Sequence, residues 1–245
     1  MIERRGELIA GCFSGRYRAY DSADAATELV LSGALGHLRE LHIRAFIAAG
    51  APTDAEPPPW RESFAMNAGG ILTNWSCYDL DYVLGVAGWS FRPRMALAQF
   101  WPCAEQFRHF VAPESDADAH FTAFVLGDDG VVLTVERGEF AATAGRSAWE
   151  IIGERGALRL SMLTTGEREI IHDDGSSSAE GTVSRTLGQG DDRAGGGNPR
   201  LIEDFALAVR EGRPPITSLE NSLTIAKITD AIYASALSGK AVTID

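Results

Sequence analysis

Short apolar segments separated by turn residues dominate the middle of the sequence, from about residue 94 to residue 187. Their expected bounds as strands are 95–101, 120–126, 131–137, 148–153, 157–162, 169–172 and 182–187, with a last strand over 241–244. Clusters such as 127–130 (GDDG) and 173–175 (DDG) lie between them and are typical of reverse turns. Short connections favour antiparallel pairing, because a parallel pair needs a long crossover. The pattern therefore predicts a large, mainly antiparallel sheet.

The segments before this run give a mixed signal. Residues 2–7 (IERRGE) resemble the charged end of a helix, and 8–13 (LIAGCF) then predict a short buried strand. Residues 21–32 have helical spacing, and Gly33 follows where a C-terminal cap is expected. Residues 38–47 alternate apolar and polar side chains, which predicts a half-buried strand.

Two helices are predicted near the end of the chain. The first covers 199–210, with Asn198 as N-cap and a proline at its first position. The second covers 217–239, where the hydroxyl of Thr217 and the side chain of Glu220 form a capping box.

Helices at both ends and strands between them indicate the α+β class: a large antiparallel sheet with helices packed on one face. The strands carry apolar residues on both alternations, as in 121–126 (FTAFVL). Large apolar patches rarely stay exposed. We therefore expect the second face to be covered by another subunit, which predicts a homo-oligomer.

The amino-acid composition excludes several classes of binding partner. A formal net charge of −12 repels nucleic-acid backbones and anionic membrane surfaces, so neither is an expected partner. The three cysteines include no CxxC pair or Cys/His cluster, so neither a disulfide framework nor a metal site is predicted. No apolar run is long enough for a signal-peptide core or a membrane span. These features together predict a cytoplasmic protein.

Residues 68–85 (AGGILTNWSCYDLDYVLG) carry the main candidate for chemistry. On a helix, Asn74, Tyr78 and Asp81 fall within about 60° of one another, while the remaining face is apolar. Buried polar groups need partners, so this stripe faces either neighbouring loops through hydrogen bonds or a ligand. Cys77 lies beside it without a motif-like histidine and is interpreted as a packing residue.

The same segment resembles the signature GG-x-L-x-D-x-G-x-H-x-x-D of the glucose–fructose oxidoreductase / inositol dehydrogenase / MocA (Gfo/Idh/MocA) family. Gly69, Gly70, Leu72 and Asp81 match it. Further resemblances follow in the family's order: 11–18 (GCFSGRYR), 28–36 (ELVLSGALG), 60–61 (WR), 149–160 (WEIIGERGALRL) and 201–239. The resemblance covers the family's carboxy-terminal domain from end to end. It implies a fold similar to the C-terminal domain of glyceraldehyde-3-phosphate dehydrogenase.

The resemblance also implies roles for residues of this sequence. The family's catalytic aspartate is replaced by Asn74 and its histidine by Tyr78. Tyrosine can act as an acid/base if its pKa is lowered, whereas asparagine can orient a hydroxyl but cannot act as a base. Tyr78 and Asn74 are therefore the candidate catalytic residues. The candidate substrate-binding residues are Trp60, Arg61, Arg16 and Asp81, and Asp81 is also a candidate structural anchor of the helix.

The nucleotide-binding half of such an enzyme has no counterpart in the sequence. A Rossmann domain needs a strand, a G-x-G-x-x-G turn and a helix, and residues 188–193 (GQGDDR) lack the third glycine. We expect residues 1–15 to be the end of a nucleotide-binding domain and 16–245 to be the substrate-binding and oligomerisation domain. NAD or NADP would serve the full-length family, and none is expected to bind this chain alone.

The sequence therefore predicts the substrate side of an oxidoreductase acting on a sugar, a polyol or a related secondary alcohol, inactive by itself. Two alternatives stay open. The chain could be a non-catalytic sugar-binding or oligomerisation module, or the partner subunit of a separate nucleotide-binding chain. The identity of the substrate and the choice between NAD and NADP are not encoded in these residues.

Overall fold

A computed structural model describes residues 2–4, 6–51, 63–145, 147–162, 168–177, 179, 181–190 and 197–245. The chain divides into two compact units. Unit 1 comprises Met1–Leu41, Tyr78–Arg92 and Trp149–Ala226. Unit 2 comprises His42–Cys77, Pro93–Ala148 and Lys227–Asp245.

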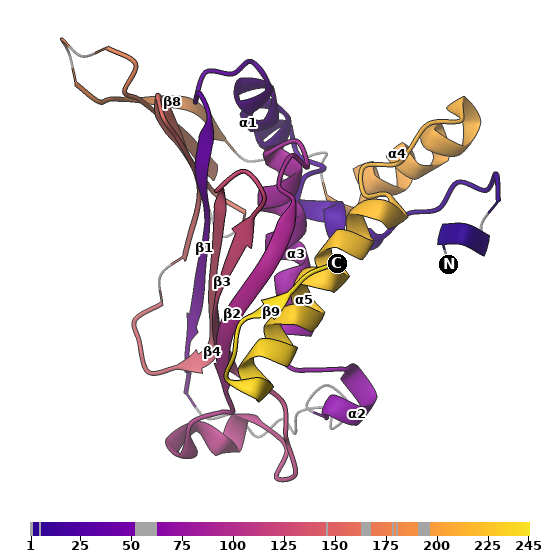
Figure 1. The fold of residues 1–245 in the computed structure, drawn as a ribbon, viewed down its shortest axis with the longest axis vertical. Coiled ribbons are helices and arrows are strands. Elements are labelled where there is room, and N and C mark those ends of the chain that lie inside the picture. The colour runs from indigo at the N-terminus through magenta and orange to yellow at the C-terminus, as the bar shows by residue number, and fades with distance from the viewer. Residues whose placement is uncertain are drawn as a thin grey trace. The chain divides into compact units, whose positions relative to one another are not determined.

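Strands form the scaffold of both units (Figure 1). They are β1 (Leu38–Ala48), β2 (Pro93–Trp101), β3 (His120–Gly127), β4 (Val132–Ala141), β5 (Ser147–Gly153), β6 (Gly156–Leu160), β7 (Arg168–Asp174), β8 (Val183–Gly190) and β9 (Val242–Thr243). Among the described residues these make one sheet with the order β8-β7-β6-β5-β1-β4-β3-β2-β9. The hairpin neighbours β2–β3, β3–β4, β5–β6, β6–β7 and β7–β8 are all antiparallel, as is β2–β9. The predicted α+β class with a mainly antiparallel sheet is confirmed.

The helical elements are α1 (Asp21–Leu31), α2 (Phe64–Asn67), α3 (Ile71–Val86), α4 (Asn198–Glu211) and α5 (Leu219–Ser238). Three short 3₁₀ segments accompany them: η1 (Ile2–Arg4), η2 (Phe13–Tyr17) and η4 (Glu105–Phe110). Within unit 1, α1 packs beside β7 and β8 (Figure 1). Within unit 2, the Ser235 hydroxyl of α5 accepts a hydrogen bond from the backbone N–H of Ala98 in β2.

The strand β3 shows why the sheet of unit 2 has one covered face. Phe121, Ala123 and Val125 are buried, whereas the alternate residues Thr122 and Phe124 are exposed. Successive side chains of a strand point to opposite faces. One face therefore carries the core of this unit, and the other is an open face that is partly apolar.

The predicted strand over 8–13 is wrong. Only an isolated bridge joins Gly11 to Ser218, and the chain then turns into η2. Leu8 and Phe13 are 73% and 52% exposed, so the apolar run is not buried as a strand would require. Its hydrophobicity alone gave a misleading signal, because a short apolar run does not specify a neighbour to pair with.

Two predicted helix caps are also wrong. Gly197 is the N-cap of α4, with φ 71°, and Asn198 lies in the first turn. A glycine tolerates this positive φ without the strain that asparagine would carry. At α5, the Ser218 hydroxyl accepts from the backbone N–H of Asn221. The hydroxyl of Thr217 is directed to a buried carboxylate instead, as described below.

Candidate functional site

The first anchor of α3 is the carboxylate of Asp118, which caps the start of the helix within unit 2. It accepts hydrogen bonds from the backbone N–H groups of Gly70 (2.7 Å) and Leu72 (3.0 Å) and from the hydroxyl of Tyr233 (2.7 Å). Asp118 is 3% exposed. A carboxylate at this position satisfies orphan N–H groups and interacts favourably with the positive end of the helix dipole.

The two glycines before α3 are explained by this anchor. A Cβ on Gly69 would lie 2.1 Å from the Tyr233 hydroxyl oxygen, and one on Gly70 would lie 2.1 Å from the Asp118 carbonyl oxygen. Gly69 also has φ 142°, which disfavours any other residue. Burial, with the negative charge of Asp118 as a second cause, raises the pKa of Tyr233 well above its ordinary value. The phenol therefore keeps its proton and donates a hydrogen bond to the carboxylate.

The second anchor of α3 is Asp81, within unit 1, and it has no exposed surface. Its carboxylate accepts from Arg18 Nε (2.6 Å), from the Ser14 hydroxyl (2.8 Å) and from the Thr217 hydroxyl (2.8 Å). Arg18 Nη2 also donates to the carbonyl of Ile216 (2.6 Å). Asp81 thus joins α3 to the segment around η2 and to the segment before α5.

Two further side chains of α3 in unit 1 form hydrogen bonds to residues in or next to the strands of that unit. The buried carboxylate of Asp79 accepts from Trp149 Nε1 of β5 at 2.9 Å. The Tyr82 hydroxyl donates to the carbonyl of Ser161 at 3.2 Å, just after β6. Together with Asp81, these contacts fix the rotation of the second half of the helix.

Tyr78 lies one turn before Asp81, half-buried, among residues of η2 in unit 1. The guanidinium carbon of Arg16 is 3.9 Å from the centroid of the Tyr78 ring. The ring of Tyr17 meets Tyr78 edge-on, with centroids 5.9 Å apart and an interplanar angle of 83°. A cation over the ring face and an aromatic edge hold the phenol in one orientation. The structure thus brings together Tyr78 and Arg16, two residues that the sequence singles out.

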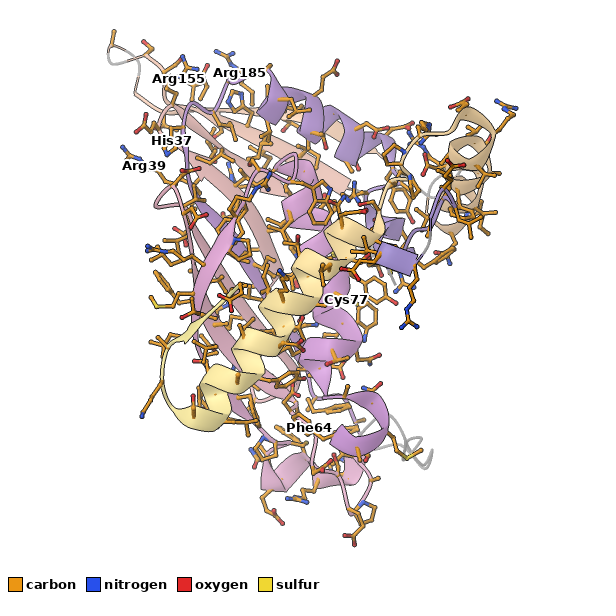
Figure 2. The ribbon with its side chains drawn as sticks, turned by 45° about the vertical axis from the view of Figure 1, so that its right-hand side comes forward. His37, Arg39, Phe64, Cys77, Arg155 and Arg185 are labelled. Atoms are coloured by element: carbon orange, nitrogen blue, oxygen red, sulfur yellow. The ribbon has the colours of Figure 1, made fainter. Side chains whose placement is uncertain are left out.

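Asn74 and Cys77 occupy the first half of α3, in unit 2. Asn74 is half-buried and precedes Tyr78 by four residues, so the two side chains share one face of the same helix. Cys77 is a partly buried thiol that forms no disulfide, labelled in Figure 2. Trp60 and Arg61, the other predicted substrate-binding residues, lie outside the described residues.

Sequence reasoning missed four contributors to this site: Asp118, Tyr233, Arg18 and Tyr17. Asp118 and Tyr233 are 48 and 163 residues from Gly70, so no local spacing indicates that they meet. The one available signal was the pair Gly69-Gly70. Two adjacent glycines predict that another group packs closely against the backbone, but they do not show which residue supplies that group.

Basic side chains gather in unit 1 at the beginning of β1, where Figure 2 labels His37, Arg39, Arg155 and Arg185. Arg39 pairs with Glu154 at 3.3 Å, and Arg185 lies 3.7 Å from Asp174. Arg155 donates to the carbonyl of Gly33 at 2.5 Å. Each arginine therefore has an acceptor within the protein, and the cluster serves local structure.

The described residues do not fit a dinucleotide. Residues 188–190 lie in β8, a strand paired antiparallel with β7, and not at a turn that opens a helix. The phosphate-binding turn of a Rossmann domain needs a parallel βαβ unit. No group of three or more His, Cys, Asp or Glu side chains in the described part of the chain is arranged to hold a metal ion. In the same part, no helix combines the length and apolar character needed to cross a bilayer.

Comparison with known proteins shows which protein family the chain belongs to. A model of the "Oxidoreductase family, C-terminal alpha/beta domain", that of Gfo/Idh/MocA proteins, matches residues 27–244. The chain therefore belongs to the Gfo/Idh/MocA oxidoreductase family and contains its C-terminal α/β domain. No curated protein sequence matches the chain.

Solved structures share the fold at low sequence identity. An oxidoreductase domain protein from Kribbella flavida is 17% identical, with a TM-score of 0.76, and the match covers 95% of this chain and 64% of that one. Levoglucosan dehydrogenase in complex with NADH and L-sorbose is 18% identical, with a TM-score of 0.75, covering 98% and 66%. An aldose-aldose oxidoreductase from Caulobacter crescentus in complex with glycerol is 19% identical, with a TM-score of 0.71, covering 94% and 62%. The chain thus spans slightly less than two thirds of the length of each of these proteins.

Proposed function

We propose that this chain is the substrate-side domain of an NAD(P)-dependent oxidoreductase that acts on a sugar, a polyol or a related secondary alcohol. The observation that carries the proposal is the middle of α3. Two buried carboxylates fix the helix, and between them Asn74 and the phenol of Tyr78 share one partly exposed face. Structures that share this fold include one with NADH and L-sorbose and one with glycerol.

Tyr78 is the proposed acid/base, exchanging a proton between its hydroxyl oxygen and a hydroxyl of the substrate. The guanidinium of Arg16 lies over the Tyr78 ring and holds the phenol in a fixed position. Asn74 is the proposed orienting group, since its amide both donates and accepts hydrogen bonds. Trp60 and Arg61 remain proposed substrate contacts.

Asp81 is better assigned to structure than to substrate. Both of its oxygens already accept hydrogen bonds from protein side chains, and the carboxylate has no exposed surface. A substrate hydroxyl would have to displace Arg18, Ser14 or Thr217. Asp81 therefore supports Tyr78 from one turn away.

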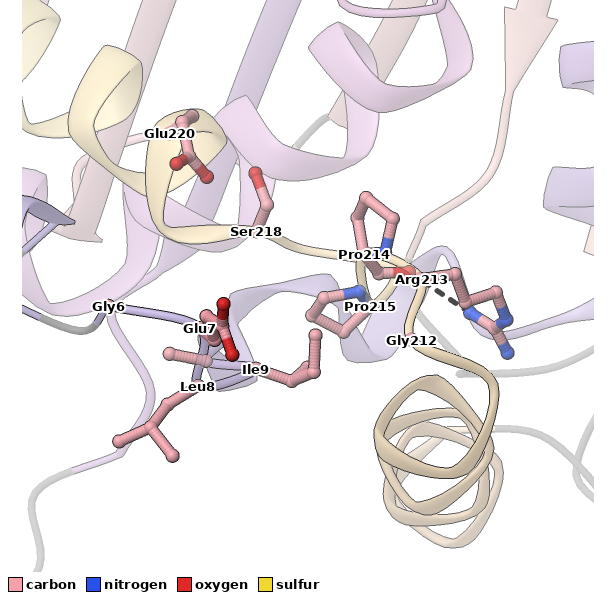
Figure 3. Close-up of a pocket in the computed structure, with 11 residues that line it drawn as sticks. Gly6, Glu7, Leu8, Ile9, Gly212, Arg213, Pro214, Pro215, Ser218 and Glu220 are labelled. Carbon is pink, nitrogen blue, oxygen red and sulfur yellow. Dashed lines mark hydrogen bonds between the residues drawn. The ribbon is translucent and has the colours of Figure 1, made fainter.

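The nucleotide is proposed to be held by a separate domain, on the same polypeptide or on another, with residues 1–15 leading from it. Unit 1 offers a surface for that domain, here called the α4 surface: Ile202, Phe205 and Val209 on one face of α4, with Leu8 and Phe13. All five are at least 41% exposed, although α4 packs beside η2. A cavity of about 380 Å³ between residues 6–10 and 212–220 adjoins it (Figure 3). The described chain gives a dinucleotide no binding motif, so NAD or NADP is expected to bind only when that domain is present.

The test uses the polypeptide that joins this chain to a nucleotide-binding domain, read from the coding DNA that flanks these residues. The joined protein should reduce NAD⁺ or NADP⁺ with at least one member of a panel of sugars and polyols. The Tyr78→Phe variant should lower kcat by about 10²–10⁴-fold, as expected for loss of an acid/base. The matched control is Tyr17→Phe, which removes a neighbouring phenol hydroxyl and should change kcat by less than about tenfold.

Full turnover by Tyr78→Phe would overturn the assignment of the base. In parallel, the isolated chain is titrated with NADH and followed by nicotinamide fluorescence. Saturable binding at micromolar NADH would contradict the assignment of the cofactor to another domain. Flanking DNA without any nucleotide-binding domain, together with sugar binding by the isolated chain, would favour a non-catalytic sugar-binding module.

We also propose that the open face of the unit 2 sheet pairs with a second copy of the chain. Leu97 and Phe124 lie opposite each other in the β2–β3 register and are 52% and 47% exposed, with Met95 close by on the same face. Apolar neighbours of this size favour burial in a partner. Analytical ultracentrifugation should show a dimer that Phe124→Asp dissociates, and a monomer at high concentration would refute the pairing.

A further inference from the structure

The backbone around Arg16 is held in place by hydrogen bonds from the residues on both sides of it. The hydroxyl of Ser14 and Nε of Arg18 both donate to the buried carboxylate of Asp81, at 2.8 and 2.6 Å. Gly15, which lies between them in η2, is buried. Because these contacts fix η2 within unit 1, the side chain of Arg16 extends from an immobile point of the backbone.

The side chain of Arg16 is itself held by two aromatic rings. Its guanidinium carbon lies 3.9 Å from the centroid of the Tyr78 ring and 5.0 Å from that of the Tyr17 ring. Nη2 of Arg16 also donates to the Tyr17 hydroxyl at 3.5 Å. Arginine has many rotamers, and fixing them normally opposes binding. Contacts already present in the protein reduce that cost for a ligand that binds the guanidinium.

The direction of the Arg16 side chain follows from the geometry of η2. Side chains three residues apart eclipse each other on a 3₁₀ helix, so Phe13 and Arg16 share one face of this segment. Phe13 is 52% exposed and belongs to the α4 surface, which is the proposed contact with the nucleotide-binding domain. Arg16 therefore lies between that proposed contact and the ring of Tyr78, the proposed acid/base.

The chemistry of a guanidinium defines what this residue can recognise. A guanidinium that contacts a ring through its carbon has its N–H donors at its edges, where they form a planar fork. That fork matches the two oxygens of a carboxylate, and the charge strengthens each hydrogen bond. The Tyr78 hydroxyl belongs to the same ring that the guanidinium covers. One small molecule can therefore place a carboxylate on Arg16 and a hydroxyl on Tyr78.

We propose that Arg16 binds a carboxylate of the substrate, so that the substrate is a hydroxy acid of the sugar-acid class and not a neutral sugar. This inference rests on the function proposed above, because it takes Tyr78 as the acid/base. The carboxylate is bound but not transformed, and the hydroxyl that contacts Tyr78 is the one oxidised. The chain carries a formal net charge of −12 and repels anions in general, so an anionic substrate needs a fixed local cation such as Arg16.

The experiment compares matched pairs of substrates in the polypeptide that joins this chain to its nucleotide-binding domain. The pairs are D-glucose with D-glucuronate, D-galactose with D-galacturonate, and glycerol with D-glycerate. In at least one pair, kcat/KM for the acid should exceed that for its neutral partner by about tenfold or more, as expected for hydrogen bonds to a charged group. A positioning role of Arg16 alone would not produce this preference.

Variants of Arg16 then assign the preference to this residue. Arg16→Met keeps an unbranched side chain against the Tyr78 ring but removes the charge, and it should lower the ratio of acid to neutral kcat/KM by about 10–100-fold. Arg16→Lys keeps the charge without the fork and should retain part of the ratio. The matched control is Arg159→Met, which removes an exposed arginine of β6 and should leave the ratio unchanged. Thermal melting verifies that all three variants are folded.

Two outcomes would overturn this inference while leaving the proposed function in place. One is turnover of the neutral sugars or polyols with an efficiency equal to that of the acids or higher. The other is an Arg16→Met variant whose KM for NAD⁺ or NADP⁺ rises while the ratio stays the same, because Arg16 would then bind a phosphate of the dinucleotide.

Absence of turnover across the whole panel would refute the proposed function, and a binding measurement then decides the role of Arg16. Saturation-transfer NMR on the same protein follows D-glucuronate, D-galacturonate and D-glycerate without turnover. Binding of an acid that is lost in Arg16→Met and kept in Arg159→Met would still support carboxylate recognition. Binding that is insensitive to Arg16→Met, or absent up to about 50 mM, would overturn it as well.

Discussion

Two buried aspartates hold the same helix in different ways. Asp118, at the start of α3, accepts from three neutral donors among the described residues: two backbone N–H groups and the Tyr233 hydroxyl. Asp81, near the end of α3, accepts from the cationic Arg18 as well as from two hydroxyls. Both carboxylates are at most 3% exposed, so neither is solvated by bulk water.

The comparison shows that burial alone does not determine how much a buried carboxylate contributes to stability, because the groups that compensate its charge also matter. Around Asp118 the helix dipole and polarised N–H groups compensate the carboxylate, and removing its charge leaves no other ion behind. Around Asp81 the compensation is a full opposite charge, whose side chain is itself only 12% exposed. Breaking that pair leaves Arg18 buried without a counter-ion, which is costly. Anchors of similar geometry should therefore respond differently to the same substitution.

Asp81→Asn should have the largest effect. It removes the counter-charge of Arg18 and should lower the free energy of unfolding by about 3–5 kcal/mol, measured by urea denaturation. A double-mutant cycle with Arg18→Met isolates the pair and should give a coupling energy above about 1.5 kcal/mol. A coupling energy near zero would mean that the hydroxyls of Ser14 and Thr217 carry the anchor instead.

Asp118→Asn should cost less, about 1–2 kcal/mol, because the asparagine oxygen still accepts while one donor loses its partner. In the corresponding cycle with Tyr233→Phe, the coupling energy should be about 1 kcal/mol, typical of a hydrogen bond that involves a neutral donor. If Asp118→Asn proved more costly than Asp81→Asn, the proposed difference between the anchors would be wrong.

The carboxylate of Asp173 pairs with an exposed arginine, and we expect it to contribute less to stability than Asp81 or Asp118. Asp173 accepts from Arg159 Nε and Nη2, both at 2.8 Å, but the Arg159 side chain is 45% exposed. The hydrogen bonds from Arg159 lower the pKa of Asp173 below its ordinary 3.8. The stabilisation is therefore fully present above that ordinary pKa and is lost as the pH falls through the folded-state value.

Asp173→Asn should lower the free energy of unfolding by no more than about 1 kcal/mol at pH 7, since solvent screens the pair. The difference from the parent chain should be smaller at pH 2 than at pH 7, because the Asp173 carboxylate takes up a proton as the pH falls. Urea denaturation at the two pH values checks this, and a difference that grows on acidification would reverse the sign argued here.

The sequence predicted the sheet well, because each strand has its own apolar alternation and its own turn residues. It also predicted a helix over α3 with a narrow polar stripe, and it singled out Asn74, Tyr78 and Asp81 by their position on that stripe. It failed where a partner is distant in the chain. Nothing near Thr217 shows that its hydroxyl bonds Asp81 instead of capping α5, since 136 residues separate the two.

The segment over 8–13 failed for a related reason. Leu8 and Phe13 are apolar, but they belong to the α4 surface and are exposed in the described chain. A hydrophobic run does not show whether its residues pack into the chain's own sheet or stay at the surface. Patterns within one segment cannot separate these two cases.

The positions of the two anchors have a consequence for how this helix could change its chemistry. Backbone N–H groups bonded to Asp118 hold the first turn of α3, and the side chain of Asp81 holds a later turn, so neither anchor uses the side chain of Asn74 or Tyr78. The side chains of the turn between the anchors can therefore be substituted without removing the hydrogen bonds that hold the helix. Under the proposed function, the side chains there could be exchanged for another pair of acids, bases or amides while the two anchors keep the helix in place. A scaffold built in this way can acquire a new substrate without first having to find a new fold.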